Sequence, residues 1–446
     1  MTATGGDATR FETAATSLSP VGASKLHHVI VSLIWFALSA QWMTVLAIIV
    51  PDQIAVMLGG DNAAKDGIAG TILAAGGVVA LVVAPISGAL SDRSRNPRGR
   101  RRLFLIVGIL GSCFGLLLLL PFGSGASLWL YAAVFMSLQF WWNWIAGAYA
   151  GLIPDVTAEK EQGRASAWLN IMTVAGAGAG NVLIVATYKT GHPFGPIAAF
   201  VALNITVLLV MLIHVREPEP ATPCSAFVLG EFLREFYVDP RVHSNFYWVL
   251  VTRLLVNMGV WSVFTFLLFY FRDVIGVAEP AQMLPTLLGI SAMLAVPASI
   301  IGIHFAAHHG LVRIAQVTSW IMAVCALYFA LIAFHPSLAL IVPFILIYAA
   351  AFGAYQAVDW ALALKVLPSV ETAGKDMGIW QISMVLPQIL APAVTGWIIS
   401  AVKLSFGDPT AYATAFGIGA LWLILAAALV TYIRLPVPIG NQIRTY

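Results

Sequence analysis

The sequence predicts an all-α polytopic membrane protein with twelve transmembrane helices in two pseudo-symmetric six-helix bundles. Three observations support this fold class. First, 60% of the 446 residues are hydrophobic and only 10% are charged, whereas soluble domains carry about 25% charged residues. Second, the chain contains twelve apolar runs that approach or exceed the roughly 20 residues a helix needs to cross a bilayer. Third, one long polar segment divides these runs into six and six.

The runs follow one another with short polar connections, so each is expected to form one helix. The first six are expected to form an N-terminal bundle, residues 27–215, and the last six a C-terminal bundle, residues 245–434. The segment 216–244 contains Pro218, Pro220 and Pro223 and a mixed-charge stretch, which predicts a central cytoplasmic loop. Residues 1–26 are expected to be a disordered cytoplasmic tail, and residues 435–446 a second tail. In order, the runs are 27–50, 67–90, 102–121, 128–153, 166–189, 196–215, 245–271, 283–306, 313–334, 338–365, 377–400 and 410–434.

The positions of the basic residues predict the orientation. With the N-terminus inside, 18 of the 23 Lys and Arg residues fall in cytoplasmic segments. The external loops hold only Lys65, Lys189, Arg272 and Lys403, and Arg253 lies inside the seventh run. Because basic loops stay in the cytoplasm, we expect both termini to be cytoplasmic and the protein to span the plasma membrane.

The two halves have the features of a repeat. Gly88, near the end of the second run, and Gly302, near the end of the eighth, are 214 positions apart. Pro154 and Pro368, which follow the fourth and tenth runs, have the same separation. Six helices per half give both halves the same orientation in the bilayer, which makes the repeat parallel.

The loop between the second and third runs is the most distinctive motif. It reads Gly-x-x-x-Asp-Arg from Gly88 to Arg93 and Gly-Arg-Arg-Arg from Gly99 to Arg102. This loop resembles the loop between helices 2 and 3 of the major facilitator superfamily, and its extended form is most similar to that of the sucrose and glycoside symporter branch. The resemblance extends over all twelve helices. It implies a secondary transporter that works by rocker-switch alternating access.

The resemblance also implies a cytoplasmic gate. Asp92 ends the second helix and is expected beside the start of the eleventh, where a helix N-terminus favours a carboxylate. The gate is expected to latch the two halves together in the outward-open state. The alternative, that the arginines only fix topology and meet anionic lipid, stays open, and we favour it for Arg95, Arg98, Arg100 and Arg102. The predicted gate residues are Gly88, Asp92, Arg93, Gly99, Arg101, Asp155 and Arg164.

Polar and aromatic side chains recur at helical spacing on the first, fourth, seventh and tenth runs. The resemblance implies that these four helices line a central cavity. Such faces combine amides with aromatic rings, which suits a neutral polyhydroxyl or a mixed polar–apolar solute. For Trp142, a lipid-facing position is an equal alternative. The predicted cavity residues are Gln41, Gln139, Trp142, Asn143, Arg253, Asn257, Trp261, Tyr355, Gln356 and Asp359.

Arg253 and Asp359 are the two ionisable residues that stand well inside the apolar runs. Charges at bilayer depth are costly and usually functional, and both residues are expected about 10–15 Å deep. They are therefore expected to share a depth and a wall. Either they form a structural ion pair, or Asp359 accepts a coupling proton and Arg253 keeps it ionised until substrate or conformation separates them.

Other classes of function find little support in the sequence. The three cysteines are far apart and read as buried apolar residues, and the sequence contains no metal-ligand cluster, phosphate loop or nucleophile triad. We expect no enzyme activity, no cofactor, no metal and no nucleic-acid partner. We expect a monomer in the lipid bilayer that moves a small organic solute, such as a sugar or glycoside, with protons. Uniport, export of apolar metabolites or drugs, and a non-transporting membrane scaffold remain as alternatives.

Overall fold

The structure, a computed structural model, is helical in the part that it describes, apart from one β-bridge between Lys189 and His192. Most of the expected central loop, nearly all of the expected N-terminal tail and the whole expected C-terminal tail lie outside the described residues. The described residues are 25–60, 62–97, 99–157, 161–215, 217, 241–366 and 373–434.

The first six runs correspond to the helices α2 to α8. The first span combines three segments because a π-helical turn, η1, joins two α-helices without a break in direction. The boundaries are α2 (Lys25–Thr44), η1 (Val45–Ile49), α3 (Val50–Met57), α4 (Lys65–Asp92), α5 (Arg102–Leu118), α6 (Leu128–Val156), α7 (Gln162–Thr187) and α8 (Phe194–His214).

The last six runs correspond to the helices α10 to α15 and a short 3-10 turn, η3. The longest helix, α15, contains two of the runs, because it bends at Gly407, where φ is 78°. The boundaries are α10 (Ser244–Phe264), α11 (Leu267–Asp273), α12 (Pro280–His309), α13 (Leu311–Ile332), α14 (Leu338–Val366), α15 (Ala373–Leu429) and η3 (Val430–Tyr432).

Each of the twelve predicted runs therefore lies on described helical segments, although the first spans α2, η1 and the start of α3, and the seventh spans α10 and most of α11. Among the described residues, nine helices are long and apolar enough to cross a membrane. One of these nine is α15, which carries two of the predicted runs, so the nine helices account for ten runs. The remaining two runs correspond to α5 and α6, which are not among the nine. The sequence prediction of an all-helical membrane protein is confirmed.

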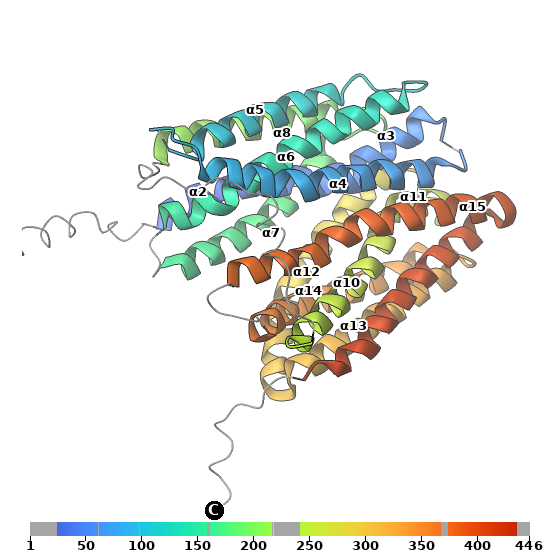
Figure 1. Ribbon diagram of the computed structural model, residues 1–446. Helices are drawn as coiled ribbons and strands as arrows, with labels where there is room; N and C mark the ends of the chain where they lie inside the picture. The colour runs from blue at the N-terminus through green and yellow to red at the C-terminus, as the bar shows by residue number, and fades with distance from the viewer. Residues whose placement is uncertain are drawn as a thin grey trace, which may run out of the picture.

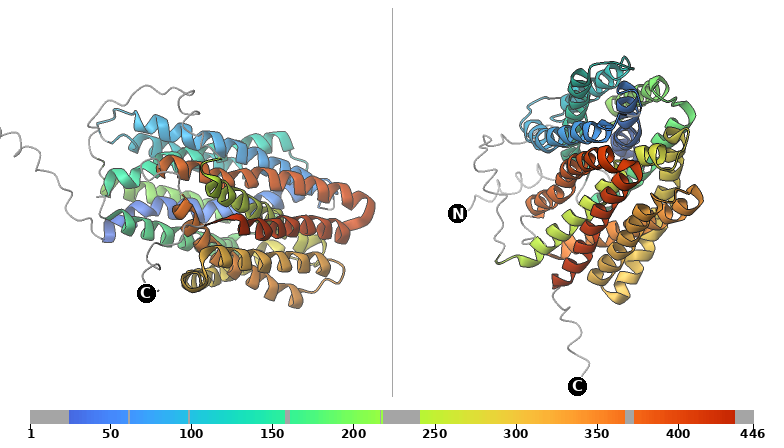
Figure 2. Two further views of the ribbon diagram at one scale, coloured as in Figure 1. Left: turned by 60° about the horizontal axis from the view of Figure 1, so that its bottom comes forward. Right: turned by 90° about the vertical axis from the view of Figure 1, so that its right-hand side faces the viewer.

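The helices form two groups that follow the two halves of the sequence. In one group α2 packs on α7 and α4 on α6; in the other α10 packs on α15 and α12 on α14. In the right-hand view of Figure 2 the group from α2 to α8, in blue and green, lies above the group from α10 to α15, in yellow-green to red. In the described part of the chain, the two most extensive seams between the groups lie between α4 and α15 and between α7 and α12.

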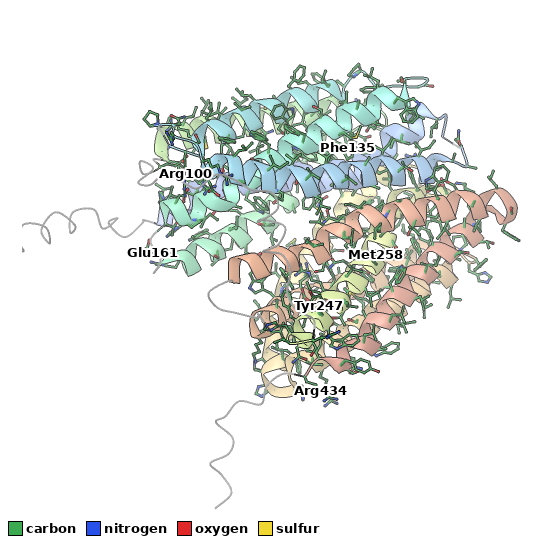
Figure 3. All side chains as sticks on the ribbon, viewed as in Figure 1. Arg100, Phe135, Glu161, Tyr247, Met258 and Arg434 are labelled. Carbon is green, nitrogen blue, oxygen red and sulfur yellow. The ribbon has the colours of Figure 1, made fainter. Side chains whose placement is uncertain are left out.

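The two groups are close at one end and diverge at the other (Figure 1). We call the end that carries residues 92–102 the arginine end, and the other end, where α3, α11 and the bend in α15 meet, the opposite end. Arg100 and Arg434 lie at the arginine ends of the two groups and are well separated in Figure 3. The α4–α15 seam is tight: a Cβ atom on Gly70 would lie 2.1 Å from the carbonyl oxygen of Pro392.

Candidate functional site

The two charges predicted inside the membrane form an ion pair. Arg253 of α10 and Asp359 of α14 meet with Nη1 and Oδ2 3.2 Å apart, and their side chains are only 3% and 4% exposed. The Tyr355 hydroxyl donates to the other carboxylate oxygen of Asp359 at 3.3 Å. The sequence prediction that these residues share a depth and a wall agrees with this geometry.

An aromatic ring and a thioether pack against the Arg253 guanidinium. Its central carbon lies 3.1 Å from the ring centroid of Trp380 on α15, and Nη2 lies 3.6 Å from the Met384 sulfur. Asn257 donates to the Arg253 carbonyl one turn earlier. A ring face attracts a cation without neutralising it, so Asp359 is the carboxylate that balances this arginine in the described structure.

A small cavity lies between the two halves, farther toward the opposite end. Its lining combines two amides, one hydroxyl, two aromatic rings and several aliphatic groups, contributed by both halves: Leu46, Leu73, Gly77, Gln139, Trp261, Phe264, Thr265, Gln388 and Pro392. Among the described residues, Gln139 Oε1 and Thr265 Oγ1 are buried without a hydrogen-bond partner. Buried polar groups are normally hydrogen-bonded, so these two atoms are available to a polar ligand.

The ion pair and the cavity are separate along α10. Arg253 and Trp261 are eight positions apart, which is about 12 Å along a helix axis. Of the predicted cavity residues, Gln139 and Trp261 line the cavity, whereas Arg253, Asn257, Tyr355 and Asp359 belong to the ion-pair cluster. Thr265 and Gln388 line the cavity but were not predicted.

Other predicted cavity residues serve the interior of the N-terminal group, which differs from the sequence expectation. Gln41 exchanges two hydrogen bonds with Asn204, at 2.9 and 3.2 Å, and the Trp142 indole donates to Ser112 at 3.1 Å. These bonds tie α2, α5, α6 and α8 together. Helices of the first and fourth runs can meet a cavity or a neighbouring helix with the same polar and aromatic side chains, so the sequence alone cannot distinguish the two kinds of face.

Two more predicted cavity residues are only half-buried. Asn143 donates to the carbonyl of Gln139 on its own helix at 2.8 Å, and Gln356 lies on α14 next to Tyr355. Neither belongs to the cavity lining among the described residues.

Ion pairs between the two halves close the opposite end. Asp52 of α3 pairs with Arg272 of α11 and accepts a hydrogen bond from Tyr188 at 2.5 Å. Lys65 at the start of α4 pairs with Asp273, Nζ to Oδ1, at 2.7 Å. Both pairs connect the N-terminal group to the C-terminal group, and the side chains of Asp52 and Lys65 are 0% and 1% exposed.

Helix α15 completes this closed end. Lys403 lies 3.0 Å from Asp273 and 2.5 Å from Asp408. The Tyr412 hydroxyl lies 2.9 Å from Asp66 and 3.0 Å from Asp273. We call the residues Asp52, Lys65, Asp66, Arg272, Asp273, Lys403, Asp408 and Tyr412 the opposite-end network.

The sequence prediction missed this network. It placed Lys65, Arg272 and Lys403 in external loops as isolated basic residues, and it placed Asp52 and Asp66 in the connection between two helices. The structure extends α3 and α4 to include both aspartates. One signal was available: three of the four basic residues that contradicted the orientation rule lie within a few positions of an aspartate in the sequence.

At the arginine end, the predicted gate residues form a cluster within the N-terminal group. Arg101 is 4% exposed and pairs with both Asp92 and Asp155. Arg100 also pairs with Asp155. The prediction that Arg100 and Arg102 serve topology alone needs correction, because Arg102 donates to the carbonyl of Leu212 on α8 at 2.7 Å.

Glu217, which the sequence analysis did not identify, joins this cluster. It accepts a hydrogen bond from the Arg101 backbone N–H at 2.8 Å. Gly99 has a φ of 117°, and a Cβ atom there would lie 2.8 Å from the Glu217 carboxyl carbon, so both the turn and the close approach require glycine. Burial raises the pKa of Glu217 above its usual value, and the Arg101 N–H partly offsets this shift.

The other predicted gate residues lie around this cluster. Arg93 donates to the carbonyl of Ala89, and Gly88 faces Gly147 of α6. Arg164 is 62% exposed and lies 3.8 Å from Glu161 on the same helix turn. The cluster therefore joins α4, the arginine loop, α6 and the segment after α8.

Comparisons with known proteins agree with this architecture. The Major Facilitator Superfamily profile matches residues 30–374. No curated protein sequence matches the chain significantly. Among solved structures, a point mutant of the nucleoside transporter NupG superposes with a TM-score of 0.69 at 15% identity, covering 92% of this chain and 99% of that one. A D-xylose–proton symporter gives 0.70 at 14% identity, covering 94% and 99%.

A third similar protein has been solved in two states. A bacterial homologue of the iron transporter ferroportin has a TM-score of 0.66 in its inward-facing state and 0.59 in its outward-facing state, at 14% identity, covering 92% of this chain and 98 to 99% of those. At these identities the likeness shows the fold. Because the family profile covers well over half of the sequence, the chain belongs to the Major Facilitator Superfamily and is a membrane transporter rather than an enzyme.

Proposed function

We propose that the protein is a secondary transporter that moves a small hydroxyl-bearing organic solute together with protons by rocker-switch alternating access. The observation that carries this proposal is the cavity between the two halves, lined by both and located inside a set of ion pairs that close the opposite end. Residues 27–215 and 245–434 would move as the two rocking units. Opening the opposite end would break those pairs while the arginine end closed.

The arginine end is proposed to face the cytoplasm of a plasma-membrane protein, with both termini on the same side. The positive-inside rule supports this orientation, since the arginine loop alone carries six basic residues. The structure would then be open to the inside. The higher TM-score against the inward-facing ferroportin homologue than against its outward-facing state is consistent with this assignment.

The cavity lining supports a polar solute with an apolar face. Gln139 Oε1 would accept a hydrogen bond from a solute hydroxyl, and Thr265 Oγ1 could donate to one or accept from one. Trp261 and Phe264 supply ring faces beside these groups. Sugars, glycosides and nucleosides combine hydroxyl groups with a flat or apolar surface, and similar structures include a nucleoside transporter and a D-xylose–proton symporter. A drug exporter would be expected to have a more uniformly apolar lining.

The Arg253–Asp359 pair is proposed to couple transport to protons. A buried carboxylate that loses its arginine must be neutralised by a proton, because an isolated charge at this depth is too costly. Movement of α10 against α14 or of Trp380 on α15 would separate the pair and make Asp359 a proton acceptor. Along α10 the pair lies on the arginine-end side of the cavity, eight positions before Trp261, so released protons would leave toward that end.

Uptake into proteoliposomes tests this proposal. Labelled pentoses, hexoses, glycosides and nucleosides are added outside the proteoliposomes. Uptake is measured with and without a pH gradient in which the outside is acidic and the inside is neutral. The expected result is accumulation of at least one hydroxylated solute that requires the gradient. Asp359→Asn should abolish accumulation and retain exchange of solute across the membrane. Accumulation that is unchanged in Asp359→Asn contradicts the coupling role, and transport of apolar drugs alone contradicts the solute class.

The arginine-end cluster is proposed to form the second gate. The Asp92 side chain is 48% exposed at the rim of the N-terminal group, and the resemblance of its loop implies a contact with the start of the eleventh helix when this end closes. The pairs of Arg101 with Asp92 and Asp155 would hold the N-terminal side of this gate in shape in both states.

A further inference from the structure

The strongest unexplained feature of the molecule is the position of the Tyr412 hydroxyl in the opposite-end network. Its oxygen lies 2.9 Å from Asp66 Oδ1 and 3.0 Å from Asp273 Oδ2. All three side chains are buried: Asp66 and Tyr412 are 0% exposed, and Asp273 is 6% exposed. A tyrosine hydroxyl carries one hydrogen, so it can donate to only one of two ionised carboxylates. The second contact needs a proton on a carboxyl group, which then donates to the tyrosine oxygen.

The other contacts identify which carboxyl group carries that proton. Asp273 receives Lys65 on Oδ1 at 2.7 Å and Lys403 on Oδ2 at 3.0 Å, and two ammonium groups favour its ionised form. Asp66 has only Lys403, at 3.9 Å from Oδ2, and Oδ2 is buried without a hydrogen-bond partner among the described residues. Asp66 is therefore the group that can hold the proton at low cost.

The charges of the network lead to the same assignment. Among the described residues, Asp52, Asp66, Asp273 and Asp408 supply four carboxylates, whereas Lys65, Arg272 and Lys403 supply three cations. Asp52 is matched by Arg272, and Asp408 is 34% exposed and can be solvated. Lys65 and Lys403 both make their close contacts with Asp273, at 2.7 and 3.0 Å, so Asp66 is the fully buried carboxyl with the longest ion pair, 3.9 Å to Lys403.

The groups around Asp66 come from all the elements that face it. Lys65 precedes it on α4, Asp273 approaches from α11, and Lys403 and Tyr412 approach from α15. Gly396 of α15 lies against the Asp66 backbone, since a Cβ atom there would lie 2.5 Å from the Asp66 carbonyl oxygen. Opening the opposite end would separate α4 from α11 and α15, which would expose Asp66 to water and remove the Tyr412 contact.

We propose that Asp66 is a second proton-binding site, which takes up one proton from the external solution when the opposite end closes and gives it up when that end opens. The site is distinct from the Arg253–Asp359 pair. This inference rests on the proposed alternating access. Because the closed state then binds one more proton than the open state, acidification outside favours closure and alkaline conditions favour opening. In the pH range in which Asp66 is ionised in the open state and protonated in the closed state, the closed-to-open ratio changes by up to about tenfold per pH unit.

Distance measurements between spin labels test the site without any transported solute. The labels are placed at Ser124 and Ala278, which are exposed at the opposite end of the two groups, in a variant with the three native cysteines replaced by alanine. The ratio of short to long distances is measured in lipid nanodiscs from about pH 8 to about pH 5. The expected result is a shift toward the short, closed distance as the pH falls.

Asp66→Asn replaces the carboxyl group by a neutral group of the same shape, so it should keep the closed distance dominant and remove the pH response. The matched control is Glu279→Gln, which neutralises an exposed carboxylate at the same end and should leave the response unchanged. As an independent measurement, Asp66→Asn should remove a protonated carboxyl band from the infrared spectrum at neutral pH.

Three results would overturn the inference: a wild-type ratio that does not depend on pH, a pH response that survives in Asp66→Asn, or a ratio that depends on sodium at fixed pH. Loss of gradient-driven uptake with a normal distance response would instead count against the proposed proton-coupled transport and leave the Asp66 site supported.

Discussion

Replacing Gly70 by alanine tests whether the α4–α15 seam controls the closed state of the opposite end. A Cβ atom at this position would lie 2.1 Å from the Pro392 carbonyl oxygen, about 1.3 Å short of the 3.4 Å at which ordinary contact begins. Backbone atoms of α15 would have to move, because no side-chain rotation relieves the clash. Overpacking of this kind costs about 1–3 kcal/mol, which corresponds to a fivefold to 150-fold change in an equilibrium constant.

The expected result of Gly70→Ala is a shift toward the open distance between labels at Ser124 and Ala278 by a factor in that range. Gly147→Ala is the matched control, because its Cβ atom would also lie 2.1 Å from a carbonyl oxygen, that of Ala84. That contact joins α6 to α4 within one half. Gly147→Ala should therefore lower the unfolding temperature without changing the closed-to-open ratio.

An unchanged label distance in Gly70→Ala would refute the idea that the seam limits opening. An equal shift in both variants would also refute it, because the response would then reflect a general loss of packing rather than separation of the two halves.

Three further variants test other parts of the structure. Asp155→Ala leaves Arg100 and the buried Arg101 with one carboxylate partner fewer. It should lower the free energy of unfolding by about 2–3 kcal/mol. A decrease of less than about 0.5 kcal/mol, measured by chemical denaturation in detergent, would contradict this. The pKa of Glu217 is raised above 4.5 in the folded protein, so this carboxyl binds more protons in the folded state than in the unfolded state. The stability of the protein should therefore fall as the pH rises through that pKa. Glu217→Gln should remove this pH dependence of the thermal unfolding temperature. Gln139→Ala should weaken binding of the transported solute about tenfold, since it removes one hydrogen bond, whereas Gln316→Ala, on α13 and outside the cavity lining, should leave calorimetric affinity unchanged.

The parts of the fold that depend on local composition could be predicted from the sequence. Each apolar run is long enough to fix a helix, and a charge such as Asp359 inside a run is conspicuous because it needs a partner at the same depth. Because each half has an even number of helices, corresponding helix ends of the two halves lie on the same side of the membrane. The expectation that Arg253 and Asp359 lie near each other therefore came from their similar depth together with the resemblance, which implies that the seventh and tenth helices line one cavity.

Contacts between distant helices could not be predicted in the same way. Lys65 and Asp273 are 208 positions apart, and nothing local to either residue indicates the other. Both lie at helix ends, where charges are expected to meet water. The face of a helix that is apolar on all sides is also undetermined, which is why Gln41 was assigned to the cavity although it pairs with Asn204 inside the N-terminal group.

The composition of the two ends explains how the chain can hold two arrangements of similar energy. Closing the opposite end with apolar side chains would gain free energy in proportion to the area buried, and reopening would lose all of it. Ion pairs behave differently, because the cost of removing charges from water nearly cancels their attraction. Lys65, Asp273 and Lys403 can therefore pair when the end is closed and be hydrated when it is open at little net cost. A small change, such as one proton on Asp66, is then enough to shift the balance between the two states.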